Sequence, residues 1–152
     1  MRVDEIMSRH VHHVDLDATL ETIRRIFEES RFHHLVVLEE GRLVGIVSDR
    51  DLLRNLSPWL GTPSERTMDT SSLKRKAHQV MTRAVVTGSA EMDVAEAARV
   101  MLVKRVSCLP VVDAWMNVVG IVTDHDILKW TVQQFCGSDP NSVCHTPDRR
   151  AA

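Results

Sequence analysis

The chain contains 152 residues, of which 43% are hydrophobic and 26% charged, and its formal net charge is -2. This charge leaves no basic excess to neutralise a phosphate backbone, so we expect no nucleic-acid partner. The chain lacks an apolar run of roughly 18 residues, as a membrane span requires, and its N-terminal segment lacks the apolar centre of a signal peptide. We therefore expect a cytoplasmic protein with no membrane partner.

The first half of the chain predicts five regular elements. An extended segment at 11–14 precedes an amphipathic helix, whose apolar face carries Leu20, Ile23, Ile26 and Phe27. The apolar runs LVVL and LVGIV flank a turn at 39–42 and predict a hairpin, and a second helix begins at Ser48. Because these apolar runs are nearly continuous, we expect both strands of the hairpin to be buried on both faces.

The second half repeats this order of elements. An extended segment at 85–87 precedes a helix whose start is marked by Asp93 and Glu96, the pattern of a capping box. A second hairpin surrounds a turn at 113–117, and its second strand leads into a helix that begins at Thr123. We therefore expect the same burial of the hairpin strands as in the first half.

The correspondence between the two halves extends to individual residues. Met7-Ser8-Arg9 matches Met81-Thr82-Arg83 at an offset of 74, and Gly45-Ile46-Val47 matches Gly120-Ile121-Val122 at an offset of 75. The extra residue falls in the turn of the second hairpin, where a duplicated fold tolerates an insertion. The chain is therefore an internal repeat.

Each repeat has the predicted order β-α-β-β-α, and a unit of about 55 residues buries too little apolar surface to be stable alone. We predict an α+β fold (α/β-type) in which two repeats pack sheet to sheet with pseudo-two-fold symmetry. The expected boundaries are 1–58 for the first repeat, 59–76 for a linker with a turn of helix from Ser71 onward, 77–135 for the second repeat and 136–152 for a flexible tail.

Taken together, these residues resemble a known family. The runs LPVVD and GIVTDHDIL, their counterparts LVVLE and GIVSDRDLL, and the Met-(Ser/Thr) pair before each are similar to a tandem cystathionine-β-synthase (CBS) domain pair, or Bateman module. The resemblance covers about residues 1–56 and 77–135. It implies a stand-alone regulatory module that forms a homodimer, acts on an unknown partner protein, and binds AMP, ADP, ATP or S-adenosylmethionine as a regulatory ligand, without an enzyme cofactor.

The motif Ser/Thr-x-x-Asp starts the second helix of each repeat, as Ser48 to Asp51 and Thr123 to Asp126. One interpretation is a capping box, in which the hydroxyl and the carboxylate satisfy the first backbone amides of the helix. The other is nucleotide binding, because a carboxylate at a helix start can accept hydrogen bonds from the hydroxyls of a ribose. The two interpretations are compatible, and the family resemblance favours ribose contact in at least one cleft.

Basic side chains near these motifs are candidate phosphate ligands. The resemblance implies that His33 and His34, which precede the central strand, lie near ligand phosphates together with Arg50, while packing in a cleft wall is the alternative. The second repeat has Ser107-Cys108 at the same positions and could draw on Lys104, Arg105 and His125, so we expect two inequivalent clefts.

Two further residues are candidates for contact with the adenine. The resemblance suggests that Thr87 presents backbone groups to the adenine edge and that Pro110 helps to enclose the ring, although an apolar strand residue belongs to the core by default.

We expect neither catalysis nor a metal site. The sequence contains no Walker loop, no GxSxG elbow and no nucleophile with an identifiable base. His10, His12 and His13 cluster, but His12 and His13 would point to opposite faces of a strand. Cys108 is either an exposed thiol at a cleft or an inert small hydrophobic residue.

A second function remains open. The clefts could be filled by side chains, and the chain would then be a structural module that regulates a partner by protein–protein contact through its dimer. In either case we expect a homodimer that buries outward apolar residues of the second helices, such as Leu53, Leu56 and Trp130.

Overall fold

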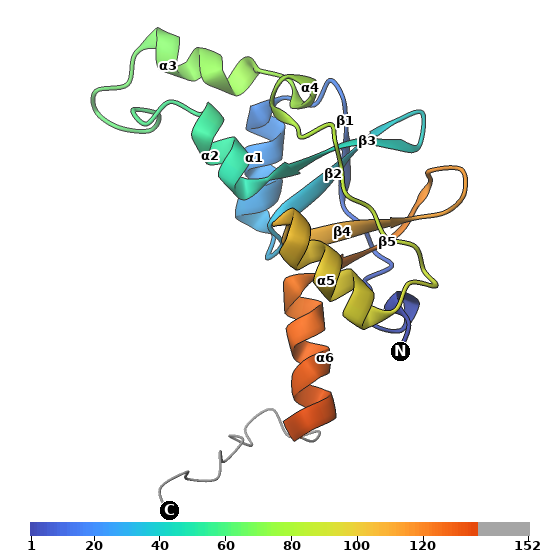
Figure 1. Cartoon of the computed structure of the whole chain (residues 1–152). Coiled ribbons are helices and arrows are strands. Elements are labelled where there is room, and N and C mark those ends of the chain that lie inside the picture. The colour runs from blue at the N-terminus through green and yellow to red at the C-terminus, as the bar shows by residue number, and fades with distance from the viewer. Residues whose placement is uncertain (137–152) are drawn as a thin grey trace, which may run out of the picture.

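The computed structural model describes residues 1–136 and shows two β-hairpins, each flanked by helices (Figure 1). The elements of the first repeat are β1 (His13–Asp15), α1 (Leu20–Glu29), β2 (His34–Glu39), β3 (Arg42–Ser48) and α2 (Asp49–Asn55). The elements of the second are α5 (Val94–Lys104), β4 (Cys108–Val112), β5 (Val118–Thr123) and α6 (Asp124–Cys136). The tail predicted over 136–152 lies, beyond Cys136, outside the described residues.

The strands form a sheet in each repeat. In the first, β1 pairs with β2 in parallel and β2 pairs with β3 antiparallel. In the second, β4 and β5 form an antiparallel pair, and Gly88 makes one parallel bridge to Val111. The predicted α+β fold with two packed repeats is confirmed.

The predicted strand over 85–87 is wrong. Thr82 pairs with Ile46 in the sheet of the first repeat, whereas Gly88 pairs with Val111 in the sheet of the second. The residues between them cross from one sheet to the other and cannot follow either ladder.

Burial of the hairpins differs between their strands. Leu35–Val37 in β2 and Cys108–Val111 in β4 are buried without interruption, as predicted. In β3 and β5 burial alternates, and the half-buried side chains include Ile46 and Ile121. The prediction of full burial is wrong for these two strands, because one face of each is open to a cleft.

Two helix starts also differ from expectation. Asp93 caps α5 as predicted, but its carboxylate accepts from the Ala95 amide and contacts the N-terminal ammonium, so no capping box with Glu96 forms. In the linker, α3 (Thr67–Ser71) begins before Ser71, because the Asp69 carboxylate accepts from the Arg66 amide, and the 3-10 turn Ser72–Lys74 follows.

The segment that leads into each repeat packs into the core of the other repeat. Val3, in the 3-10 turn Val3–Glu5, and Met7 are buried in the core of the second repeat, with Leu109. Ala77, which starts the short helix α4 (Ala77–Val80), and Met81 are buried in the core of the first. Each core is therefore completed only when both repeats are present.

The exchange of lead-in segments is fixed by equivalent contacts on both sides. Ser8 and Ile121 exchange two backbone hydrogen bonds of 2.9 Å, and Thr82 and Ile46 exchange two of 2.9 and 3.1 Å. One residue before each of these pairs, Met7 lies against Gly120 and Met81 against Gly45, so closely that a Cβ at either glycine would overlap the methionine sulfur.

We predict that Gly45→Ala lowers the free energy of unfolding in urea by about 1–3 kcal/mol. A Cβ at position 45 would lie 2.9 Å from Met81 Cγ and 3.2 Å from Met81 Cβ, so rotation of the thioether alone does not relieve the overlap. Gly88→Ala is the control, because the nearest atom to a Cβ there, Met92 Sδ, is at 3.6 Å. Equal stability of Gly45→Ala and the unsubstituted protein would contradict the packing described.

Candidate ligand-binding clefts

The second helix of each repeat starts with the same hydrogen-bonded turn. Oδ2 of Asp51 accepts hydrogen bonds from the amide of Ser48 at 2.9 Å and from its hydroxyl at 2.6 Å. Oδ2 of Asp126 accepts the equivalent bonds from Thr123, at 2.8 and 2.7 Å. The capping interpretation is therefore correct in both repeats, because the same hydrogen bonds form at Ser48 and at Thr123.

This turn leaves half of each carboxylate free for a ligand. Only Oδ2 of Asp51 and of Asp126 accepts hydrogen bonds from the described part of the chain. Both residues are half-buried, and each lines a cleft between the repeats. Capping and ligand contact are therefore compatible at the same aspartate, since they use different oxygens.

The larger cleft has a volume of about 590 Å³ and is built from both repeats. The first repeat supplies its lead-in segment, 8–12, and the residues before β2, 31–34. The second repeat supplies the end of β5 and the start of α6. The lining residues are Ser8, His10, Val11, His12, Arg31, Phe32, His33, His34, Ile121, Thr123, Asp124, His125 and Asp126.

The smaller cleft has a volume of about 170 Å³ and uses the equivalent segments with the repeats exchanged. Its lead-in segment and the residues before β4 come from the second repeat, and the end of β3 with the start of α2 comes from the first. The lining residues are Ile46, Ser48, Asp51, Thr82, Ala84, Val85, Val86, Arg105, Val106, Ser107 and Cys108, together with His34.

Aromatic and basic side chains line the larger cleft. The ring of His12 stacks on Phe32 at 4.2 Å between centroids and meets His10 edge-on at 4.7 Å. Nδ1 of His33 lies 2.8 Å from Oδ2 of Asp49, which belongs to the first turn of α2. This wall therefore combines flat aromatic surface with several hydrogen-bonding nitrogens.

His34 stands between the two clefts and lines both. Its Nε2 lies 3.0 Å from the hydroxyl of Ser107, the residue that occupies the position of His33 in the second repeat. Burial lowers the pKa of His34, and the negative charge of Asp49 opposes that effect only in part. The imidazole is therefore neutral at neutral pH.

Cys108 is a buried residue of the smaller cleft. Its side chain is 6% exposed, and burial, assisted by the negative charge of Asp124, raises the pKa of the thiol to about 12. Of the two interpretations, the inert small hydrophobic residue is the correct one, because only the thiolate reacts readily.

Three of the residues singled out from the sequence lie outside the lining of both clefts. Arg50 is exposed on α2, and Thr87 follows the last lining residue of its segment. Pro110 is fully buried in β4, where its carbonyl accepts a hydrogen bond from the Gly88 amide. The other seven lie in the clefts: Ser48, Asp51, His33, His34, Thr123, His125 and Asp126.

The lead-in residues of the larger cleft have no clear signal in the sequence. His10 and His12 indicate at most a metal site when viewed alone, and Ser8 and Val11 indicate no ligand chemistry. The one indication is the internal repeat, because it predicts that the two lead-in segments occupy equivalent places in the fold. Their place opposite Asp126 follows from the exchange of lead-in segments.

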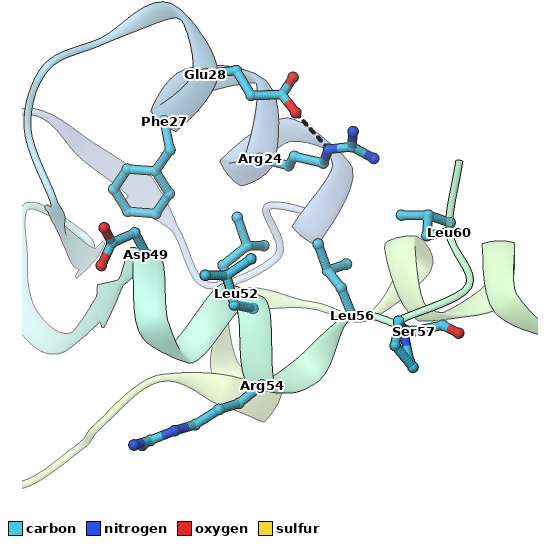
Figure 2. A pocket seen from close by; sticks show the side chains of 11 residues that line it. Arg24, Phe27, Glu28, Asp49, Leu52, Arg54, Leu56, Ser57 and Leu60 are labelled. Atoms are coloured by element: carbon cyan, nitrogen blue, oxygen red, sulfur yellow. Dashed lines mark hydrogen bonds and ion pairs between the residues drawn. The ribbon is translucent and has the colours of Figure 1, made fainter. Parts of the chain in front are cut away.

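A third hollow, of about 690 Å³, lies on the helical side of the first repeat rather than between the repeats. Figure 2 shows it between α1 and α2, with Leu52, Leu56 and Leu60 along its floor and the ion pair of Arg24 with Glu28 (2.6 Å) at its edge. This groove lacks a Ser/Thr-x-x-Asp turn of the kind that lines the clefts, although it borders Asp49.

Comparison with known proteins identifies the family. The CBS domain matches residues 3–58 and 77–132, so the chain belongs to the CBS domain family. A CBS domain-containing protein of Dictyostelium discoideum is 34% identical over 142 residues, which cover 92% of this chain and 97% of that protein. An uncharacterised protein of Methanocaldococcus jannaschii is 29% identical over 133 residues, which cover 84% of this chain but 46% of that protein.

Solved structures show the same fold with ligands. The CBS domain pair of protein MJ0100, in complex with 5-methylthioadenosine and S-adenosyl-L-methionine, has a TM-score of 0.74 and 26% identity, and the match covers 88% of this chain and 98% of that one. The cytosolic domain of the Mg²⁺ channel MgtE, in complex with ATP, has a TM-score of 0.67 and 26% identity, over 85% of this chain and 48% of that one.

Neither a metal site nor a membrane-spanning helix is found among residues 1–136. Within this range, no group of three or more His, Cys, Asp and Glu side chains is arranged to hold a metal ion. None of the helices described there combines the length and the apolar character needed to cross a membrane.

We predict that Cys108 resists modification in the folded protein. In a Cys136→Ser/Cys144→Ser variant, reaction of the remaining thiol with a disulfide reagent at about pH 8 should be roughly 100-fold slower in buffer than in urea, because unfolding returns the thiol to its ordinary acidity. The rate is followed by absorbance of the released thiol. Similar rates in buffer and in urea would show that the thiol is accessible and ionised.

Proposed function

We propose that this protein is a cytoplasmic regulatory module that binds an adenosine-containing ligand, AMP, ADP, ATP or S-adenosylmethionine, in the clefts between its repeats. The observation that carries the proposal is the free Oδ1 of Asp126 beside Thr123, at one wall of a cleft large enough for a nucleotide. Nucleotide serves as a regulatory ligand rather than as a cofactor, and the chain catalyses no reaction.

The chemistry of the larger cleft suits such a ligand. A carboxylate oxygen that is not used by the helix cap accepts hydrogen bonds from vicinal ribose hydroxyls. Val11, Ile121 and Phe32 supply apolar and aromatic surface for a base. The first amides of α6 favour a negative charge near the helix start.

Two related structures support the ligand class. The CBS domain pair of MJ0100 was solved with 5-methylthioadenosine and S-adenosyl-L-methionine, and the MgtE domain with ATP. The moiety common to these ligands is adenosine, and the element common to the two clefts here is the carboxylate of the Ser/Thr-x-x-Asp turn.

Regulation follows from the construction of the clefts. Each cleft takes its walls from both repeats, so a ligand binds one arrangement of the repeats more tightly than another and shifts their populations. A partner protein responds to that shift.

We predict that AMP or ATP, at roughly 100 times its Kd, raises the melting temperature by about 5–10 °C. Asp126→Asn should weaken binding by about 10–100-fold, because the amide retains an oxygen for the cap but loses the charged acceptor for ribose. Asp51→Asn is the matched substitution in the smaller cleft and should cost less. Absence of a shift with every adenosine ligand at millimolar concentration would refute the proposal.

The second proposal, a dimerisation module, has its own observation. Leu128, Val132 and Phe135 share one face of α6 and are 63%, 44% and 79% exposed. Leu53 of α2, which corresponds to Leu128, is 71% exposed, whereas Leu56 and Trp130 are half-buried. Apolar rows of this kind mark interfaces, and we propose that a second copy of the chain covers them.

We predict that light scattering after gel filtration gives the mass of a homodimer and that Leu53→Glu/Leu128→Glu gives a monomer, because buried charge opposes association. Met68→Glu is the control, since Met68 is 82% exposed but belongs to α3 rather than to α2 or α6. A monomeric unsubstituted protein, or a dimer that persists in the double variant, would rule out this interface.

A further inference from the structure

The larger cleft concentrates the histidines of the protein. Five of the eight histidines in the sequence line it: His10, His12, His33, His34 and His125. They come from the lead-in segment, from the residues before β2 and from the first turn of α6. All except His34 are exposed, so their imidazoles are accessible to a ligand and to solvent protons.

Because the chain is duplicated, each histidine of this cluster can be compared with the equivalent residue of the other repeat. The positions that correspond to the five histidines in the other repeat are occupied by Ala84, Val86, Ser107, Cys108 and Arg50. The first four of these line the smaller cleft, and Arg50 lies outside it. Four of the histidines therefore belong to the larger cleft alone, His34 borders both clefts, and the fold does not require histidine at these positions.

The charges that do not vary near neutral pH leave the larger cleft weakly negative. Its lining contains one permanent cation, Arg31, and two carboxylates, Asp124 and Asp126. Asp49, from α2, faces the cleft through its contact with His33, and Asp51 lies near enough to His34 to influence it. Such a set of charges opposes a phosphate group while the imidazoles are neutral, against the first amides of α6, which favour it.

Protonation of the imidazoles reverses this sign. Histidine is the side chain that changes charge between pH 5 and 8, and each protonated ring offers two N–H donors in place of one. Charge-assisted hydrogen bonds from such donors are the strong contacts that hold a phosphate. The same cleft thus changes from repelling to attracting an anion within the physiological range of pH.

We propose that the larger cleft selects a phosphate-bearing adenosine ligand and takes it up together with protons, so that imidazolium groups hold the phosphate and affinity rises as the pH falls. The inference rests on the proposed function and names the ligand class of one of its two sites. The smaller cleft, with about 170 Å³, has the permanent cation Arg105 but none of the four exposed histidines, so its affinity for a phosphate does not depend on them.

The four exposed histidines and His34 have different parts in this selection. His10, His12, His33 and His125 supply the charge, and Nδ1 of His33 lies 2.8 Å from Oδ2 of Asp49. Burial lowers the pKa of His34, so this imidazole is not counted among the groups that supply charge. It is a positioning residue, held by Ser107 at the boundary of the two clefts.

The test measures the Kd of AMP and of adenosine for the full chain by calorimetry at about pH 8 and about pH 6.5. AMP should bind about tenfold more tightly at the lower pH, because binding is linked to proton uptake. Adenosine, which has no phosphate, should bind equally at both. The phosphate of AMP has a second pKa near 6 and loses charge as the pH falls, so its own titration acts in the opposite direction.

A variant and a matched control locate the effect. His10→Gln/His33→Gln/His125→Gln keeps hydrogen-bonding groups at three exposed positions but removes their titration, and should reduce the dependence of AMP affinity on pH to the part that His12 supplies. His13→Gln, at an exposed residue of β1 outside the cleft lining, should retain it. Circular dichroism verifies that both variants fold.

The outcomes separate this inference from the proposed function. If AMP binds with equal affinity at both pH values, or if the triple variant keeps the full pH dependence, the inference is overturned while ligand binding stands. If AMP, adenosine and S-adenosylmethionine all fail to bind at either pH, both the inference and the proposed function are refuted. Tighter AMP binding at lower pH that is reduced in the triple variant but not in His13→Gln supports both.

Discussion

The contact on which the rest of the structure depends is the packing of each lead-in segment against a glycine of the opposite repeat. Met7 lies on Gly120, Met81 lies on Gly45, and a pair of backbone hydrogen bonds follows each methionine. Because a unit of this size has little core of its own, burying these segments in the opposite repeat contributes to both cores at once. Neither repeat is therefore complete without the other, and the pseudo-two-fold symmetry follows from this reciprocal exchange.

The same exchange creates the clefts. After the methionine, each lead-in segment must cross from the opposite sheet back to its own, and the residues in this crossing, 8–12 and 82–86, face the first turn of the opposite second helix. The backbone that forms the two clefts is thus nearly symmetric, whereas their side chains are not. Where one cleft has imidazoles, the other has Ala84, Val86 and Cys108, so a duplicated scaffold carries two sites with different electrostatics.

The Ser/Thr-x-x-Asp turn connects folding to function within one side chain. Oδ2 of Asp51 and of Asp126 satisfies the start of a helix, which fixes the orientation of the carboxylate and leaves Oδ1 turned away from the cap. A ligand that binds Oδ1 therefore meets a group already held in place, and little conformational entropy is lost on binding. Because one carboxylate oxygen caps the helix and the other binds the ligand, a motif that is common at helix starts also serves as a binding element.

The sequence by itself determined the duplication, the order of elements in the first repeat, the two capping turns and the family, because these depend on local hydrogen bonding and on patterns repeated at a fixed offset. It did not determine that Val85–Thr87 would leave the sheet, that Ile46 and Ile121 would face clefts, or that Cys108 would be buried. Nor did it bring His10 and His12 to Asp126. Those features arise from the exchange of lead-in segments between repeats, and only the tertiary structure decided them, since contacts between residues far apart in the sequence leave no local pattern to read.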